Sequence, residues 1–486
     1  MTDDRTTPPV RVVETHISVL VFVGDRVYKL RKPVRFDFLD FTDRVVREAD
    51  CQREVELNRR LAPDVYLGVA DIVMDGRAID HMVVMRALPA ERRLATLVRE
   101  GLDVDVWLTR VATTLAEFHA GARRSEAISE AGTGHALQAA WDANFDETRR
   151  FVGTILDAMV DEEIRHTVSR WLVSHQALLE DRCASGQVCD GHGDLQAEDI
   201  FCLDDGIRIL DCIEFSDDLR YGDVCADVAF LAMDLERLGR PDAAERFVLH
   251  YEAQAGERLP RPLLHHYIAQ RAYVRTKVTC LQVEQGREDA RRDARELHAL
   301  ALRHIRRSRQ VLVLVGGLPG TGKSTLAAGL AAETGWDLLR SDELRWELQP
   351  SVGAGTPTAD TGRYEPAAVG AVYDELIVRA RRHLDEGEAV ILDASWIDAG
   401  RRAVAVRAAA ETGSAIVELR CTCEEPVATA RINERSKGQD DVSEATPHVR
   451  SVMAARMDPW PSSVTIDTSR RSPDECVSWA LREIAP

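Results

Sequence analysis

Hydrophobic and polar positions alternate near the start of the chain and then follow a helical period. Residues 16–23 and 26–32 are two strand-like runs that flank a Gly-Asp turn, a pattern typical of a β-hairpin. Residues 44–61 place apolar side chains at helical spacing and predict an amphipathic helix. Residues 82–88 predict another strand, whereas residues 104–184 have mainly helical patterning. The first half is therefore predicted to combine a small β-rich region with a larger helical region.

The second half has a different pattern, in which short apolar runs are separated by helical segments. Residues 311–315 form an unbroken apolar run, as a buried parallel strand should. Four further strands are expected at residues 336–339, 389–392, 415–421 and 464–466. Five strands separated by helices predict an α/β fold with a doubly wound parallel sheet. Ligands bind at the carboxyl ends of the strands in such sheets.

A glycine-rich segment follows the first of these five strands. Residues 316–325 are Gly-Gly-Leu-Pro-Gly-Thr-Gly-Lys-Ser-Thr and contain the pattern G-x-x-x-x-G-K-[ST]. Glycines let backbone N–H groups surround a phosphate, and the helix N-terminus behind them adds partial positive charge. We expect Lys323 to contact the β- and γ-phosphates of ATP, and the Ser324 hydroxyl to bind Mg²⁺. A glycine-rich turn with a chance lysine is the alternative. The predicted nucleotide-binding residues are Gly317, Leu318, Pro319, Gly320, Thr321, Gly322, Lys323, Ser324 and Thr325.

Two acids and two arginines accompany this loop. Asp342 and Asp393 follow predicted strands and should face the loop, so that one accepts a proton from an acceptor hydroxyl and the other holds Mg²⁺ or its waters. Each could instead cap the following helix. Arg431 and Arg435 are four residues apart where nucleotide-kinase-like folds have a lid, and there they would neutralise charge in the transition state. A solvated helix face is the alternative for either arginine.

The first half holds a second set of residues suited to phosphoryl transfer. Lys29 in a predicted strand and Glu54 in the predicted helix match the pair with which kinases hold the α- and β-phosphates, although two surface residues are the alternative. Asp199 follows Asp194 by five positions, and Asp211 follows it by 17, across a strand–turn–strand segment. Kinases place a catalytic aspartate and two metal ligands in this order. The alternative is a metal-free acidic loop.

The residues around Asp194 make the first half recognisable. His192-Gly193-Asp194-Leu195, with residues 211–215 (Asp-Cys-Ile-Glu-Phe) and 223–227 (Asp-Val-Cys-Ala-Asp), resembles the aminoglycoside-phosphotransferase-like kinases. Nearly the whole chain resembles a two-domain bacterial family of predicted kinases that fuses such a half to a P-loop kinase half. The resemblance implies a protein-kinase-like α+β fold, with a small β lobe and a helical lobe, for the first half.

This resemblance also implies roles for residues of the first half. Asp194 would be the catalytic base and Asp211 the metal ligand. Lys29 and Glu54 would position the phosphates, and Asp227 would be an acid that orients the loop. The family pattern usually has His in place of Gln196 and Asn in place of Asp199, although Asp199 can still ligate Mg²⁺ through oxygen. The family's phosphate-covering glycines are also missing between the first two strands.

The second half resembles the small P-loop kinases related to polynucleotide kinase and zeta-type toxins. On that resemblance Asp342 is the base, Arg345 a substrate contact and Asp393 the second acid.

Length and composition limit these expectations. A chain of 486 residues needs two or three domains, predicted at 1–290 and 310–486 with a helical linker at 291–309. The 62 Lys and Arg residues against 81 Asp and Glu give a net charge of −19, which disfavours broad binding to nucleic acids or anionic membranes. Ten cysteines without a CxxC pair, a polar N-terminus and the lack of an apolar run of about 18 residues favour a cytoplasmic protein with reduced thiols.

These observations favour ATP- and Mg²⁺-dependent phosphoryl transfer to a hydroxyl of a small molecule, chiefly by the second half. Two alternatives stay open: a nucleotide-binding regulatory protein with little turnover, and a 5′-hydroxyl polynucleotide kinase. The acceptor depends on loop geometry that a sequence does not reveal.

Overall fold

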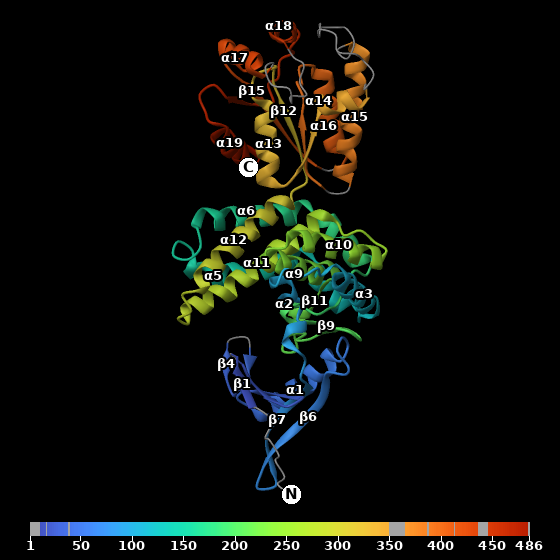
Figure 1. Ribbon diagram of the computed structural model, residues 1–486, viewed down its shortest axis with the longest axis vertical. Coiled ribbons are helices and arrows are strands. Elements are labelled where there is room, and N and C mark those ends of the chain that lie inside the picture. Colours follow the sequence, from blue (N-terminus) through green and yellow to red (C-terminus); the bar gives the residue numbers. More distant parts are fainter. Residues whose placement is uncertain are drawn as a thin grey trace. The chain divides into compact units, whose positions relative to one another are not determined.

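The computed structural model describes residues 10–15, 17–36, 39–348, 365–385, 388–412, 414–435 and 446–484 (Figure 1). The chain divides into two compact units, residues 1–259 with 266–302, and residues 260–265 with 303–486. The domain limits expected from the sequence, with a linker at 291–309, stay a prediction. Helix α12 (Ala290–Arg307) crosses the division. It is not fully solvated, because Ala290 and Ala294 are buried against Phe151 and Cys280.

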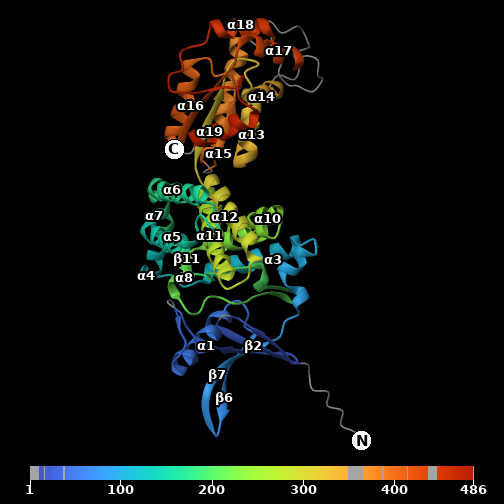
Figure 2. The same ribbon diagram turned by 90° about the vertical axis from the view of Figure 1, so that its left-hand side faces the viewer.

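The first unit begins with an antiparallel sheet in the order β1-β2-β3-β7-β6. The predicted hairpin is confirmed, since Val21 pairs with Tyr28 across its two strands. Helix α1 lies against the sheet (Figure 2) and buries Cys51 and Val55 with Val83 of the sheet. The elements of this lobe are β1 Val10–Glu14, β2 Ser18–Val23, β3 Arg26–Arg31, β4 Arg35–Phe36, β5 Leu39–Asp40, α1 Arg44–Asn58, β6 Tyr66–Met74 and β7 Arg77–Arg86.

A helical region follows, which includes the short strands that carry the candidate catalytic loop. Trp141 stacks on Phe145, and both are buried against Tyr273. The helices are α2 Leu94–Arg99, α3 Asp105–Gly121, α4 Glu126–Ser129, α5 Gly134–Thr148, α6 Ala158–Ser174, α7 Gln176–Ala184, α8 Asp217–Arg220, α9 Val224–Arg237, α10 Pro241–Ala255 and α11 Arg261–Glu284. The strands are β8 Val188–Asp190, β9 Ile200–Leu203, β10 Gly206–Ile209 and β11 Tyr221–Asp223. The small β lobe and the helical lobe confirm the predicted α+β fold.

The second unit is a doubly wound α/β domain, as predicted. Its five parallel strands have the order β13-β14-β12-β15-β16. Helices α13 and α19 cover one face, and α15 and α16 cover the other (Figure 1). The strands are β12 Val311–Gly316, β13 Asp337–Arg340, β14 Val390–Asp393, β15 Ala415–Thr422 and β16 Val464–Asp467. The helices are α13 Lys323–Thr334, α14 Ser341–Leu348, α15 Pro366–Asp385, α16 Ala399–Glu411, α17 Glu425–Arg435, α18 Pro447–Ala455 and α19 Pro473–Ile484.

All ten cysteines are free thiols, and Cys421 is buried in the sheet. In the part of the chain that the structure describes, no helix is both long enough and apolar enough to cross a bilayer.

Candidate functional site

The glycine-rich loop joins the end of β12 to the start of α13. Gly317 and Gly320 have φ angles of 145° and 80°, which favour glycine. Steric crowding also requires glycine at both positions. A Cβ atom at Gly317 would lie 2.5 Å from the Cys421 carbonyl oxygen, and one at Gly320 would lie 2.6 Å from that of Ala428. The loop is therefore packed closely against β15 and α17, with its backbone held where a phosphate can approach it.

Lys323 and Asp393 meet beside this loop. Lys323 Nζ lies 3.3 Å from Ser324 Oγ and 3.6 Å from Asp393 Oδ1. Asp393 is 3% exposed at the end of β14, and its Oδ1 has no hydrogen-bond partner among the described residues. Arg340 Nε lies 3.4 Å from the other carboxylate oxygen, Oδ2. The carboxylate oxygen and the hydroxyl, which both neighbour the Lys323 ammonium group, are hard-oxygen donors that suit Mg²⁺. Ser324 and Asp393 therefore fit a magnesium ion.

The two acids expected at the strand ends have different surroundings. Asp342 lies in the first turn of α14 and is ion-paired with Arg345 one turn later. Asp393 does not cap the helix that follows it, because Asp398 is the N-cap of α16. Arg340 was not foreseen from the sequence. It pairs in register with Asp393 across β13 and β14, so that Asp342, two residues later, belongs to the same carboxyl edge of the sheet.

Arg431, which the sequence assigns to a lid, is anchored next to the loop. Its Nη1 and Nη2 atoms donate to Oγ1 and the carbonyl oxygen of Thr468, each at 2.9 Å. Thr468 Oγ1 in turn donates to the Thr321 carbonyl oxygen at 2.8 Å. Arg450, which the sequence did not single out, donates to the Pro319 carbonyl oxygen at 2.7 Å. Arg435 ends α17, and its side chain lies outside the described residues.

The first unit brings its predicted lysine–glutamate pair together. Lys29 Nζ donates to Glu54 Oε1 at 2.8 Å and to Asp211 Oδ1 at 2.9 Å. The side chains of Lys29 and Glu54 are 11% and 0% exposed, so the alternative of two surface residues is wrong. The Lys29 ammonium holds the pKa of Asp211 below its ordinary value.

A buried arginine that the sequence did not assign supports this pair. Arg31 Nε donates to Asp50 at 2.6 Å, and its Nη2 donates to Glu54 at 2.7 Å and also contacts Glu214. Burial raises the pKa of Glu214 to about 7. The signal was present in the strand pattern, since Arg31 is two residues from Lys29 and projects to the same face.

The loop with Asp194 is held by a buried aspartate. Asp227 accepts hydrogen bonds from the backbone N–H groups of His192 at 2.7 Å and Gly193 at 2.9 Å, as well as from His119 Nε2 at 3.2 Å. Gln196 Nε2 donates to Asp194 Oδ2 at 2.9 Å. His119 is buried in helix α3, and its Nδ1 atom also contacts Tyr251 Oη at 2.8 Å.

Three carboxylates interact around this loop. Burial raises the pKa of Asp194 to about 6, and nearby Arg275 and Asp211 act on it in opposite directions. Burial raises the pKa of Asp199 as well, and the negative charges of Asp211 and Asp194 add to that rise. Carboxylates whose negative charges raise one another's pKa in this way favour a divalent cation beside them. Asp199 and Asp211 could therefore hold Mg²⁺ in the first unit.

The burial of Asp194 predicts a pH-dependent stability. Its folded-state pKa lies above the value near 3.9 expected for an unfolded chain. The stability it contributes is therefore complete below about pH 4 and is lost as the pH rises through about 6. We expect Asp194→Asn to be more stable than the wild type at pH 7.5, with the difference disappearing at pH 4. Hydrogen exchange of residues 191–215 in the full chain measures this difference in stability between the variant and the wild type. Asp218→Asn, at an exposed position, should show no such trend.

The chain is similar in sequence to a protein-family model and to a known relative. Residues 312–460, which include the glycine-rich loop and Asp393, match the family model described as an AAA domain. The chain is 42% identical over 465 residues to the uncharacterized protein Rv2004c of Mycobacterium tuberculosis (strain ATCC 25618 / H37Rv). The aligned residues cover 95% of this chain and 93% of that protein.

Two solved structures are similar to one part of the chain each. One is the GDP complex of wild-type aminoglycoside 2′-phosphotransferase-IIIa, which is 15% identical to this chain with a TM-score of 0.38. The match covers 62% of this chain and 94% of the phosphotransferase chain. The Mycobacterium tuberculosis APS kinase CysC, in complex with AMPPNP and APS, is 20% identical, with a TM-score of 0.28, and covers 37% of this chain and 98% of that chain.

Proposed function

The chain belongs to the family of the Mycobacterium tuberculosis protein Rv2004c, and we propose that it is an ATP- and Mg²⁺-dependent phosphotransferase. The acceptor is a hydroxyl of a small molecule, and the second unit is the main catalyst. The observation that supports this proposal most strongly is the buried Asp393 Oδ1, which has no hydrogen-bond partner among the described residues and lies 3.6 Å from Lys323 Nζ. A strand, a glycine loop and a helix that begins at the lysine surround it.

Each group of this site has a task in the proposed reaction. The loop N–H groups, the α13 N-terminus and Lys323 bind the β- and γ-phosphates. Ser324 and Asp393 would hold Mg²⁺, which neutralises phosphate charge when bound. Asp342 accepts the proton of the acceptor hydroxyl. Arg431, already fixed to Thr468, stabilises charge that develops on the transferring group.

An acceptor screen tests the proposal. ADP formation is measured with ATP, Mg²⁺ and panels of sugars, aminoglycosides and nucleosides, for the wild type, Asp194→Ala and Lys323→Ala. We expect one class of acceptor to stimulate ADP formation in the wild type and Asp194→Ala but not in Lys323→Ala. Loss in Asp194→Ala alone would move the activity to the first unit. Equal baselines for all three proteins with every acceptor would refute phosphoryl transfer.

A regulatory nucleotide site is the second candidate for the first unit. The observation that favours it is the direct contact between Lys29 Nζ and Asp211 Oδ1, at 2.9 Å, because it joins the phosphate-positioning cation to the predicted metal ligand. Asp199, in place of the family's asparagine, puts a further carboxyl group where its charge and those of Asp211 and Asp194 act against one another. Equilibrium dialysis should then show that Lys323→Ala still binds nucleotide, although this variant does not turn ATP over. The Lys29→Ala/Lys323→Ala double variant should lose that binding. Undiminished binding in the double variant would exclude this site.

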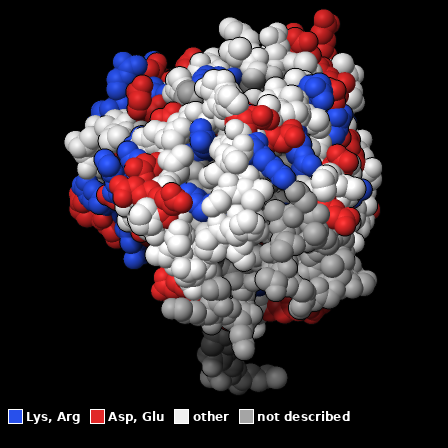
Figure 3. Space-filling view, turned by 90° about the horizontal axis from the view of Figure 1, so that it is seen from above, with Lys and Arg blue, Asp and Glu red and all other residues white. Residues whose placement is uncertain are grey.

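The polynucleotide kinase alternative has weaker support. On the face of the second unit in Figure 3, the described basic and acidic residues are intermixed rather than gathered into a basic stripe.

A further inference from the structure

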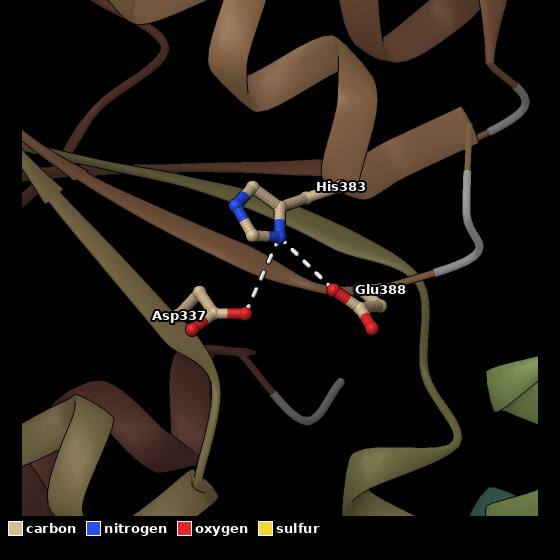
Figure 4. A group of neighbouring side chains, drawn as sticks. All are labelled: Asp337, His383 and Glu388. Carbon is tan, nitrogen blue, oxygen red and sulfur yellow. Dashed lines mark hydrogen bonds and ion pairs between the residues drawn. The ribbon is translucent and has the colours of Figure 1, made fainter. Parts of the chain in front are cut away.

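A histidine and two acids from three separate elements meet in the second unit (Figure 4). Asp337 is the first residue of β13, His383 lies in the last turn of α15, and Glu388 precedes β14. His383 Nδ1 lies 3.3 Å from Asp337 Oδ2 and 3.0 Å from Glu388 Oε2. One ligand atom from each residue lies within 4.8 Å of the others. Three side chains thus direct their donor atoms at one point.

The sheet register and one backbone hydrogen bond impose this convergence. Asp337 pairs with Val390, so that its side chain is on the same face of the sheet as Val390. Helix α15 covers that face, because Val390 packs in one cluster with Ala380 and Leu384. The Glu388 N–H donates to the His383 carbonyl oxygen at 2.8 Å, which holds Glu388 beside the last turn of α15. The donor atoms are therefore positioned by backbone structure that forms for other reasons.

We propose that Asp337, His383 and Glu388 form a binding site for a divalent transition-metal cation of the Zn²⁺ class. One imidazole nitrogen and two carboxylate oxygens are ligands that zinc accepts, and water can complete a tetrahedral set. The imidazole selects against Mg²⁺, which prefers oxygen ligands only. On binding, His383 releases the Nδ1 proton to solvent and directs the freed lone pair at the cation, while the two carboxylates stay ionised.

The electrostatics of the group are consistent with a cation site. Hydrogen bonds to Asp337 and Glu388 raise the pKa of His383 to about 10, so the two carboxylates already stabilise one positive charge at this point. His383 and the nearby Arg307 hold the pKa of Asp337 below its ordinary value, and Asp337 is therefore ionised. Arg307 also acts on Asp337, and its guanidinium group lies beside Gly335.

The site is separate from the nucleotide loop. All five strands are parallel, and the loop follows the carboxyl end of β12, whereas Asp337 and Glu388 lie at the amino ends of their strands. A cation here would join β13, α15 and the approach to β14, and it would stabilise the second unit without touching the phosphates. It therefore has a role apart from the proposed reaction, and its test requires no substrate.

Zn²⁺ binding to the full chain tests the proposal. The protein is first freed of any affinity tag and treated with a chelator, and binding is then measured by calorimetry and by thermal unfolding, both without nucleotide. We expect one Zn²⁺ per chain and a rise of roughly 5–10 °C in the Tm of the second unit at about 100 times Kd. His383→Gln and Asp337→Asn should each weaken binding by about tenfold or more. His448→Gln, at an exposed histidine of the same unit, should bind as the wild type does.

Co²⁺ provides a second readout that does not depend on stability. Its visible absorption should show a low-coordinate site with nitrogen and oxygen ligands in the wild type and in His448→Gln, and this signal should be lost in Asp337→Asn. The proposal is refuted if the wild type binds neither ion, or if both variants of the cluster bind Zn²⁺ undiminished. ATP binding that a variant retains in a Lys29→Ala background, where the proposed nucleotide site of the first unit is removed, shows that its second unit is folded.

Discussion

Replacing Lys323 with methionine lowers kcat for acceptor-dependent ADP formation by on the order of 10²–10³. The loss is large because the ammonium group, 3.6 Å from the buried Asp393 carboxylate, is placed to offset negative charge as the phosphoryl group transfers. Methionine keeps the length and the apolar part of the side chain, so packing beside the loop is nearly retained. Single-turnover kinetics with saturating ATP measure the chemical step directly.

Two control variants isolate the charge at Lys323 from the loss of a lysine in general. Lys277→Met removes a lysine of the first unit that pairs with Glu147 on α5, and it should leave kcat unchanged. Lys323→Arg keeps the charge but not its point-like geometry, and it should recover only part of the rate. An Lys323→Met enzyme as fast as the wild type would contradict the assignment of Lys323 to the transferring phosphate.

Replacing Arg31 with methionine destabilises the first unit by about 3–5 kcal/mol. The side chain of Arg31 is 1% exposed and contacts the carboxylates of Asp50, Glu54 and Glu214. Removal of the guanidinium leaves buried negative charges without their main partner, and Lys29 then neutralises only part of them. Hydrogen exchange of β3 and α1 in the full chain measures the free energy of opening.

Arg26, a much less buried arginine of the same strand, provides the control for Arg31→Met. Arg26 begins the same strand, and its side chain is 39% exposed beside the exposed Asp25, so Arg26→Met should change the free energy by no more than about 0.5 kcal/mol. The loss in Arg31→Met should shrink as the pH falls toward about 7, because Arg31 lowers the pKa of Glu214 in the wild type and Glu214 therefore takes up a proton at a higher pH in the variant. Equal, small effects of both variants would mean that the Arg31 cluster does not stabilise the lobe.

Local sequence patterns were sufficient to predict much of the fold. The parallel sheet follows from apolar runs between helices, and the phosphate loop follows from strand, glycines, lysine and helix in one continuous segment. Lys29 and Glu54, which are 25 residues apart, could be paired because kinases place this lysine in a strand and this glutamate in a following helix.

Contacts between distant residues required the structure. Arg31 pairs with Glu214 over 183 positions, and Arg340 meets Asp393 over 53. Nothing in the spacing of these residues indicates such pairs. A charged residue in a strand is equally compatible with solvent and with a buried partner until the neighbouring strand and the covering helix are known.

The sequence alone determined which chemical groups this protein has and which short segments carry them. Only the tertiary structure decided which of those groups meet. Sheet register placed Asp337 beside the approach to β14, helix packing brought His383 over it, and the end of β14 left Asp393 buried next to Lys323. The physical reason is that side-chain periodicity is a local property of the backbone, whereas burial and charge pairing depend on elements that meet only when the chain is folded.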